Sequence, residues 1–369
     1  MTISDFDRQM MQRCLELAAK ATGKTTPNPL VGSVIVRDGQ IVGEGYHPQA
    51  GEPHAEVFAL RNAGDKARGA TVYVNLEPCN HHGRTPPCSE ALIRAEIAKV
   101  VVGMVDDNPQ VDGTGIKKLR DAGIEVVVGV EEPACRKLNE AFLQRICHQK
   151  PLGILKYAMT LDGKIAATTG HSAWVSSKDS RHQVHTLRST CDAVVIGGNT
   201  VRKDNPQLTN HGVGEHNPLR VIMSRSLDLP VDFQIWDTSV APTIVFTQPQ
   251  SNPPLQECLQ EKGVEIVELP EVTPAVVNQY LYDRGLSKIL WECGGVLAAK
   301  AIADGAIQKI MAFIAPKIIG GQTAPSPVGD LGIALMSDAL CLKNIEITAI
   351  GQDILIEGYL KSREDQQLG

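Results

Sequence analysis

The sequence has little of what marks a membrane protein, a secreted protein or a nucleic-acid-binding protein. Aromatic residues make up 4% of its 369 residues, and no apolar run is long enough to cross a bilayer. The formal net charge is −6, whereas a general nucleic-acid binder presents a basic surface. No signal-peptide pattern opens the chain. We therefore expect a cytoplasmic protein with neither a nucleic-acid nor a membrane partner.

Disulfide bonds are not expected either. The nine cysteines are an odd number, and their spacing is not that of a disulfide framework. In a reducing compartment such cysteines are more often buried or bound to a metal. Cys14, Cys135 and Cys147 are predicted to be buried thiols on helices, whereas Cys79 and Cys88 belong to a metal-binding pattern.

The length of the chain predicts two domains, because 369 residues exceed what one ordinary hydrophobic core contains. Strand and helix patterns alternate in both halves, which predicts α/β folds with partly parallel sheets. A polar stretch over residues 145–151 ends in a helix-stopping proline. We place the boundary there, with domains at residues 1–148 and 149–369.

Three potential zinc ligands lie in the first half. His54 starts a predicted helix, Cys79 follows a predicted strand, and Cys88 opens the helix predicted for residues 89–98. One imidazole and two thiolates are the number of ligands that a catalytic zinc uses when its fourth position is left for water. With Glu56, they match the H-x-E…P-C pattern of zinc nucleobase deaminases, except that eight residues, not two, separate the cysteines.

Glu56 is the predicted proton carrier of this site. Zinc lowers the pKa of a bound water from about 15.7 to about 7, which makes hydroxide available at neutral pH. Glu56 would take the proton of that water and pass protons to the ring and to the departing ammonia. The alternative is a closed structural zinc, with His81 or His82 as the fourth ligand. We interpret both histidines as pocket-lining residues.

Two strand–Gly-Gly–helix turns recur in the second half, at Gly197-Gly198 and Gly294-Gly295. Glycine lets backbone amides approach an anion, and the helix N-terminus that follows favours negative charge. Neither turn is a G-x-G-x-x-G fingerprint. The pair indicates a nucleotide cofactor but does not distinguish NAD, NADP or a nucleotide substrate.

Longer motifs resemble the bifunctional deaminase/reductase family of riboflavin biosynthesis. In the first half they are residues 26–32, 45–47, 51–56, 76–88 and 107–109; in the second half they are residues 156–164, 172–174, 205–206, 291–295 and 315–317. The resemblance implies an N-terminal cytidine-deaminase-like α/β/α domain and a C-terminal dihydrofolate-reductase-like α/β domain that uses NADPH. It also implies zinc on His54, Cys79 and Cys88, with Glu56 as proton donor. The family further suggests self-association.

The same resemblance implies a substrate and a set of residues in the second domain. The substrate is a diaminopyrimidinone carrying ribosyl 5′-phosphate, which loses the amino group at ring position 2 before its ribosyl chain is reduced. The implied cofactor contacts are Ala158, Trp174, Thr200, Asp204, Gly294, Gly295, Val296, Leu297, Ala298, Ala299 and Lys300. The implied substrate contacts are Ser172, Arg188, Leu208 and Glu292.

Two positions depart from the family pattern, and one role stays open. The family usually has an arginine near His211 and an Asp-Ser pair at Ser224-Arg225, so the corresponding contacts are not carried over. Opening the ribosyl ring needs an acid. Asp204, Lys156 and Glu292 are candidates by residue type, and the sequence does not rank them.

Overall fold

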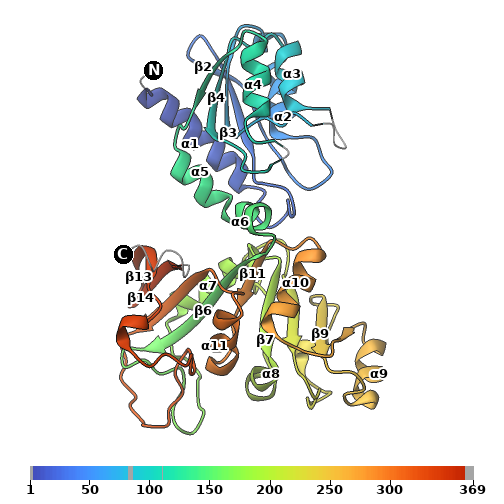
Figure 1. Ribbon diagram of the computed structural model, residues 1–369, viewed down its shortest axis with the longest axis vertical. Helices are drawn as coiled ribbons and strands as arrows, with labels where there is room; N and C mark the ends of the chain where they lie inside the picture. Colours follow the sequence, from blue (N-terminus) through green and yellow to red (C-terminus); the bar gives the residue numbers. More distant parts are fainter. Residues whose placement is uncertain (1–2, 82–85, 110, 362–369) are drawn as a thin grey trace. The chain divides into compact units, whose positions relative to one another are not determined.

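Figure 1 shows the computed structural model, which describes residues 3–81, 86–109 and 111–361. The chain divides into two compact units, Met1–Gln149 and Lys150–Gly369. Each unit has its own sheet and its own hydrophobic core. Among the described residues, no helix has both the length and the apolar character that crossing a bilayer requires.

A mixed sheet forms the centre of the first unit, with strand order β2-β1-β3-β4-β5. Its strands are β1 (Gly32–Arg37), β2 (Gln40–Tyr46), β3 (Thr71–Leu76), β4 (Lys99–Met104) and β5 (Glu125–Val128). The predicted hairpin joins β1 and β2, and both Asp38 and Gly39 take the left-handed backbone that such a turn requires. β3, β4 and β5 run parallel, so their carboxyl ends share one edge of the sheet, where ligands bind in α/β folds.

Helices cover both faces of this sheet and give three layers (Figure 1). They are α1 (Asp5–Ala19), α2 (Ala55–Ala63), α3 (Cys88–Arg94), α4 (Thr114–Asp121), α5 (Glu132–Leu138) and α6 (Glu140–His148). One core cluster joins α2, α3 and α4 to the sheet through Ala59, Leu92 and Leu119. A second cluster, on α1 and α5, contains Cys14 and Cys135. The described part of the first unit is thus an α/β/α sandwich.

The second unit is built on a larger sheet with strand order β10-β9-β8-β7-β11-β6-β12-β14-β13. Its strands are β6 (Leu152–Thr160), β7 (Ala193–Gly197), β8 (Leu219–Met223), β9 (Thr243–Thr247), β10 (Glu265–Glu268), β11 (Lys288–Trp291), β12 (Lys309–Ala315), β13 (Leu342–Ile350) and β14 (Asp353–Leu360). The sheet is parallel from β10 to β12, and the β13–β14 hairpin is added antiparallel at the edge.

Helices of the second unit connect the parallel strands. They are α7 (Lys178–Ser189), α8 (Gly198–Asp204), α9 (Pro253–Glu261), α10 (Pro274–Asp283) and α11 (Gly295–Ala303). The two Gly-Gly turns lead from β7 into α8 and from β11 into α11, as the sequence predicts. Because β7 and β11 are neighbours in the sheet, the two turns lie close together at its carboxyl edge.

Three local predictions were wrong or incomplete. The helix predicted for residues 89–98 ends at Arg94, and Glu96 then takes left-handed backbone (φ 53°) before β4. Cys135 is buried on α5 as predicted, but Cys147 is exposed on α6, a separate helix with no buried residue. Helix α9 was not predicted.

Candidate metal site and cofactor pocket

His54 and Glu56 are placed by the start of α2. His54 is the N-cap residue with extended backbone (φ −75°, ψ 163°), and Glu56 lies in the first turn. Pro53 lies just before the N-cap, outside the helix, where its missing N–H costs no helical hydrogen bond. The imidazole is thereby held at the helix end, and Glu56 points from the same turn into the protein, where it is 3% exposed.

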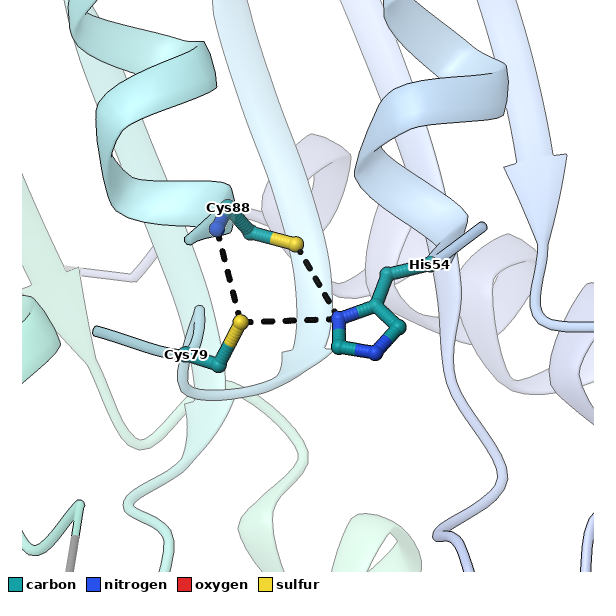
Figure 2. Close-up of side chains that lie close together, drawn as sticks. All are labelled: His54, Cys79 and Cys88. Carbon is teal, nitrogen blue, oxygen red and sulfur yellow. Dashed lines mark hydrogen bonds between the residues drawn. The ribbon is translucent and has the colours of Figure 1, made fainter. Parts of the chain in front are cut away.

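The two cysteines come from the neighbouring connection. Cys79 lies shortly after β3, and Cys88 is the first residue of α3. His54 Nδ1 is 3.2 Å from Cys88 Sγ and 3.5 Å from Cys79 Sγ (Figure 2). The Cys88 backbone N–H donates to Cys79 Sγ at 3.4 Å. The three ligand atoms lie within 4.8 Å of one another, which is the arrangement that a tetrahedral ion needs.

The donor chemistry of this group fits zinc. Hydrogen bonding within the group, first from Cys88, lowers the pKa of the Cys79 thiol, while the bond to Cys79 and burial raise the pKa of Cys88. A hydrogen bond to Cys79 also raises the pKa of His54. A soft, negatively polarised sulfur beside an imidazole is a typical zinc environment.

Glu56 is the carboxylate beside this group. Burial raises its pKa, and the nearby Cys79 adds to that effect. Its Oε2 atom is buried and has no hydrogen-bond partner among the described residues. Buried polar atoms are nearly always bonded, so an unpartnered carboxylate oxygen is a sign of a functional site. It fits a residue that takes up and releases protons beside a metal.

The alternative of a fourth protein ligand concerns His81 and His82. Within the described residues, His81 is exposed and is not part of the ligand group. His82 lies outside the described residues. The prediction that both histidines line a pocket therefore remains a prediction.

The structure adds His47 to the site, a residue to which the sequence assigns no role. It is buried, and its ring lies 5.5 Å from that of His54 in an edge-on arrangement. One ring nitrogen is 3.1 Å from Asn28 Nδ2 and the other is 3.1 Å from the Pro53 carbonyl. His47 and Asn28 both belong to the motifs that resemble the riboflavin-biosynthesis family, so these motifs could have pointed to them. Only the fold shows that the two residues meet beside His54.

An open pocket of about 950 Å³ lies in the second unit, at the carboxyl edge of its sheet. It includes both Gly-Gly turns. The predicted residues that line it are Ala158, Ser172, Trp174, Arg188, Thr200, Asp204, Glu292, Gly294, Gly295, Val296, Leu297 and Lys300. Its size suits a dinucleotide together with a small substrate.

Three of the predicted contact residues do not line this pocket. Ala298 and Ala299 are buried on α11, and Ala298 belongs to the core cluster. Leu208 is 3% exposed, with left-handed backbone (φ 53°). A run of consecutive residues on a helix places some of its members on the far face. The structure therefore gives no pocket contact to these three.

A buried charge triad forms the floor of the pocket. Glu292 accepts from Arg188 Nε at 2.6 Å and Nη2 at 3.1 Å, and from Lys156 Nζ at 3.4 Å. Burial alone would raise the pKa of Glu292, but the charges of Arg188 and Lys156 outweigh it and lower this pKa to about 2. Glu292 is therefore ionised at neutral pH and lies between two basic side chains.

Trp174 stands at the edge of the pocket with 68% of its surface exposed. The Arg181 guanidinium lies 4.2 Å from the centre of its ring. Lys317 Nζ donates to the Trp174 carbonyl at 2.6 Å and to the Val175 carbonyl at 2.9 Å. An exposed indole with a cation over one face leaves its other face for a flat ligand.

The positions that depart from the family pattern also lie at the pocket. His211 stacks on His185, a pocket-lining residue, with ring centres 4.2 Å apart. Burial and the charge of Arg188 lower the pKa of His211, and burial with the charge of His211 lowers the pKa of His185 to about 4. His185 is therefore neutral at pH 7. Ser224 and Arg225 line the pocket as well.

Comparison with known proteins places both units. Residues 4–104 match the family "cytidine and deoxycytidylate deaminase zinc-binding region", and residues 151–356 match the family "RibD C-terminal domain". The riboflavin biosynthesis protein RibD of Synechocystis is 62% identical over 97% of this chain and 98% of its own length. The chain belongs to the RibD family.

Solved structures of the RibD family share the whole fold. One from Acinetobacter baumannii is 37% identical over 97% of this chain and 99% of its own, with a TM-score of 0.85. Another, from Thermotoga maritima, is 36% identical over 96% of this chain and 99% of its own, with a TM-score of 0.83. The Thermotoga protein is a diaminohydroxyphosphoribosylaminopyrimidine deaminase/5-amino-6-(5-phosphoribosylamino)uracil reductase.

Membership in the RibD family confirms the predicted fold class and function. The first unit has the cytidine-deaminase-like fold, and the second has the dihydrofolate-reductase-like fold of the RibD reductase. The chain is a bifunctional enzyme of riboflavin biosynthesis, with a zinc-dependent deaminase and an NADPH-dependent reductase.

Proposed function

We propose that the first unit removes the amino group at ring position 2 of a diaminopyrimidinone carrying ribosyl 5′-phosphate, and that the second then reduces its ribosyl chain to ribityl. The observation that carries this proposal is the His/Cys/Cys group beside buried Glu56 in one unit, combined with the pocket of the other. The two activities of the Thermotoga protein support this order of substrates.

We propose that His54, Cys79 and Cys88 hold the zinc and that Glu56 moves the protons. When bound, zinc supplies the activation of water that hydrolytic deamination requires. Glu56 Oε2, unpartnered within the described residues, accepts a proton from the attacking water. Glu56 gives this proton to the ring nitrogen, takes up the second proton from the hydroxyl group that the water has become, and passes it to the departing amino group, so that ammonia leaves as a neutral molecule and a ring carbonyl remains.

In the second unit we propose two neighbouring sets of contacts. Toward NADPH they are Ala158, Trp174, Thr200, Asp204, Gly294, Gly295, Val296, Leu297 and Lys300, and toward the substrate they are Ser172, Arg188 and Glu292. NADPH supplies the hydride when bound. Because Arg188 already gives hydrogen bonds to Glu292 and to the Thr209 carbonyl, it would serve the substrate mainly through its charge and remaining N–H groups.

Lys156 is the proposed proton donor for opening the ribosyl ring. Glu292 is held ionised and has no proton to give. Burial lowers the pKa of Lys156, although Glu292 partly offsets this, and a lower pKa makes an ammonium a better acid. The pKa of Asp204 is raised by burial, but no described contact joins Asp204 to the triad. Lys156 therefore ranks above Asp204.

Metal removal tests the assignment of the two reactions to two units. After exhaustive chelation, we expect ammonia release from the diaminopyrimidinone phosphate to fall below detection, because the ligand group lies wholly in the first unit. NADPH oxidation with the deaminated compound should continue at its original rate. Re-adding zinc should restore ammonia release. Loss of both activities on chelation would contradict separate sites.

A side chain at Gly294 should block the cofactor without disturbing the fold. A Cβ atom there would meet no heavy atom within 4 Å, and the backbone (φ −70°, ψ 163°) suits any residue. Gly294→Val should therefore fold normally and weaken NADPH binding by about tenfold or more, since it fills space at the helix N-terminus. Fluorescence titration with NADPH would measure this, and zinc content should stay unchanged.

We also propose self-association and a cytoplasmic location. The edge strand β13 and its neighbour β14 expose Ile345, Ile347 and Ile354 at 55%, 69% and 45%. An exposed edge strand rich in isoleucine is unusual in a soluble monomer. Light scattering would give the copy number. All nine cysteines are free thiols, which supports a reducing compartment.

A further inference from the structure

Glu77 is a buried carboxylate to which the proposed reactions assign no role. It follows β3, two residues before Cys79, and it is 3% exposed. Its Oε1 atom accepts from the backbone N–H groups of Gly115 at 2.9 Å and Ile116 at 3.1 Å. Its Oε2 atom accepts from those of Gly113 at 3.0 Å and Asp106 at 3.2 Å. Four backbone amides thus converge on one side chain.

These amides belong to the connection that follows the neighbouring strand. β3 and β4 are parallel with Leu76 opposite Met104, and the Glu77 N–H donates to the Met104 carbonyl at 3.0 Å. Asp106 leaves β4 beside Glu77, and the other three donors lie at the N-terminus of α4. The carboxylate therefore fastens the connection after β4 to the connection after β3, which carries Cys79.

Close packing at Gly115 is an independent sign of the same contact. A Cβ atom at Gly115 would lie 2.0 Å from the Pro78 carbonyl oxygen, so only glycine permits this approach. Asn80 Nδ2 also donates to the Thr114 carbonyl at 3.4 Å. The first turn of α4 thus rests directly on the residues that flank Cys79.

Capping of α4 explains only half of the hydrogen bonds made by Glu77. A cap needs an acceptor for the first amides of the helix, and Oε1 supplies it. Oε2 binds the Gly113 and Asp106 amides, which precede the helix. Asp106 is itself buried, and burial raises its pKa to about 6, although the Asn108 N–H opposes this effect. A buried carboxylate with a raised pKa is frequent at functional sites, and Glu77 holds this one through its backbone N–H.

We propose that Glu77 is a positioning residue of the deaminase. Its hydrogen bonds hold Asp106 and the start of α4 beside Cys79, so that this side of the pyrimidine site is in place before the substrate binds. Glu77 does not touch the metal ligands through its side chain in any described contact. Its effect is on substrate binding rather than on the chemical step. The inference rests on the proposed deaminase function of the first unit.

Glu77→Gln tests this with little change of shape. The amide has one acceptor oxygen, so its NH₂ group must face two of the four backbone N–H donors. We expect the KM of ammonia release to rise about tenfold or more, because hydrogen bonds to a charged acceptor are lost. Because Glu56 and the zinc ligands are untouched, kcat should change by less than about threefold. Zinc content and the kinetics of the reductase should equal those of the unaltered chain.

Gly115→Ala disturbs the contact between α4 and Pro78 from the side of the helix. It should raise the KM of ammonia release without removing a charge. Ser4→Ala is the matched control. It removes the capping box of α1, which lowers the stability of the same unit away from the site, and it should leave KM unchanged.

Three outcomes would overturn the inference. In the first, Glu77→Gln lowers the melting temperature but leaves KM unaltered. In the second, Glu77→Gln loses zinc and KM does not change. In the third, Glu77→Gln is insoluble, whereas Gly115→Ala is soluble and has a normal KM. If the unaltered zinc-loaded chain releases no ammonia, the proposed function fails, and hydrogen exchange at the Gly113 and Gly115 amides still decides whether Glu77 holds them.

Discussion

Ammonia release should fall by about 100-fold or more in Glu56→Gln, because general acid–base catalysis by a positioned side chain contributes about that much. Glutamine has the same shape but neither takes up nor gives a proton at neutral pH. Reduction of the already deaminated compound should proceed at the original rate, since Glu56 lies in the first unit and the pocket in the second. Ammonia detection and NADPH absorbance measure the two activities on one sample.

A matched control for this experiment is Glu52→Gln. It makes the same chemical change four residues away, but Glu52 is exposed, so its activity should stay within about twofold. Zinc content should be unchanged in both variants. If Glu56→Gln kept full ammonia release, or lost both activities with zinc still bound, the assigned proton role would be wrong.

The grouping of His54, Cys79 and Cys88 could be predicted because its information is local. Each of the three is placed by the end of one helix or strand, and the apolar pattern gives those elements directly: His54 at the start of α2, Cys79 after β3, Cys88 at the start of α3. Parallel strands then bring successive connections to one edge of the sheet. Residue type, order and element type together were enough, despite the unusual spacing of the cysteines.

Contacts between residues far apart in the chain could not be predicted in the same way. Glu77 and Gly115 are 38 positions apart, and the sequence does not state that four amides face one carboxylate. Even over seven positions, the contact between His47 and His54 depends on how the end of β2 lies against the start of α2. In the second unit, the family resemblance indicated Arg188 and Glu292 as substrate contacts but did not indicate that they bond to each other. That ion pair keeps Glu292 ionised, and it therefore decides which candidate acid can hold a proton.

The second large effect is expected at the buried triad. Glu292→Gln removes the carboxylate that Arg188 and Lys156 share, at a place where their side chains are only 12% and 16% exposed. Removing one partner of a buried pair costs about 3–5 kcal/mol, so the second unit should lose that much stability, and the reductase should lose most of its activity. All three tryptophans, Trp174, Trp236 and Trp291, lie in the second unit, so their fluorescence during urea unfolding reports on it specifically.

The dependence on pH separates an ion pair from simple packing. The pKa of Glu292 is about 2 in the folded protein, below the usual 4.5, so its contribution is fully present above pH 4.5 and is lost as the pH falls toward 2. The stability difference between the unaltered chain and Glu292→Gln should therefore shrink over that window. Glu265→Gln is the control: its pair with Arg284 is 42% and 40% exposed, and the change should cost less than about 1 kcal/mol. An equal cost at both positions would mean that burial adds nothing to the triad, and a difference that is independent of pH would mean that the glutamate acts through its shape rather than its charge.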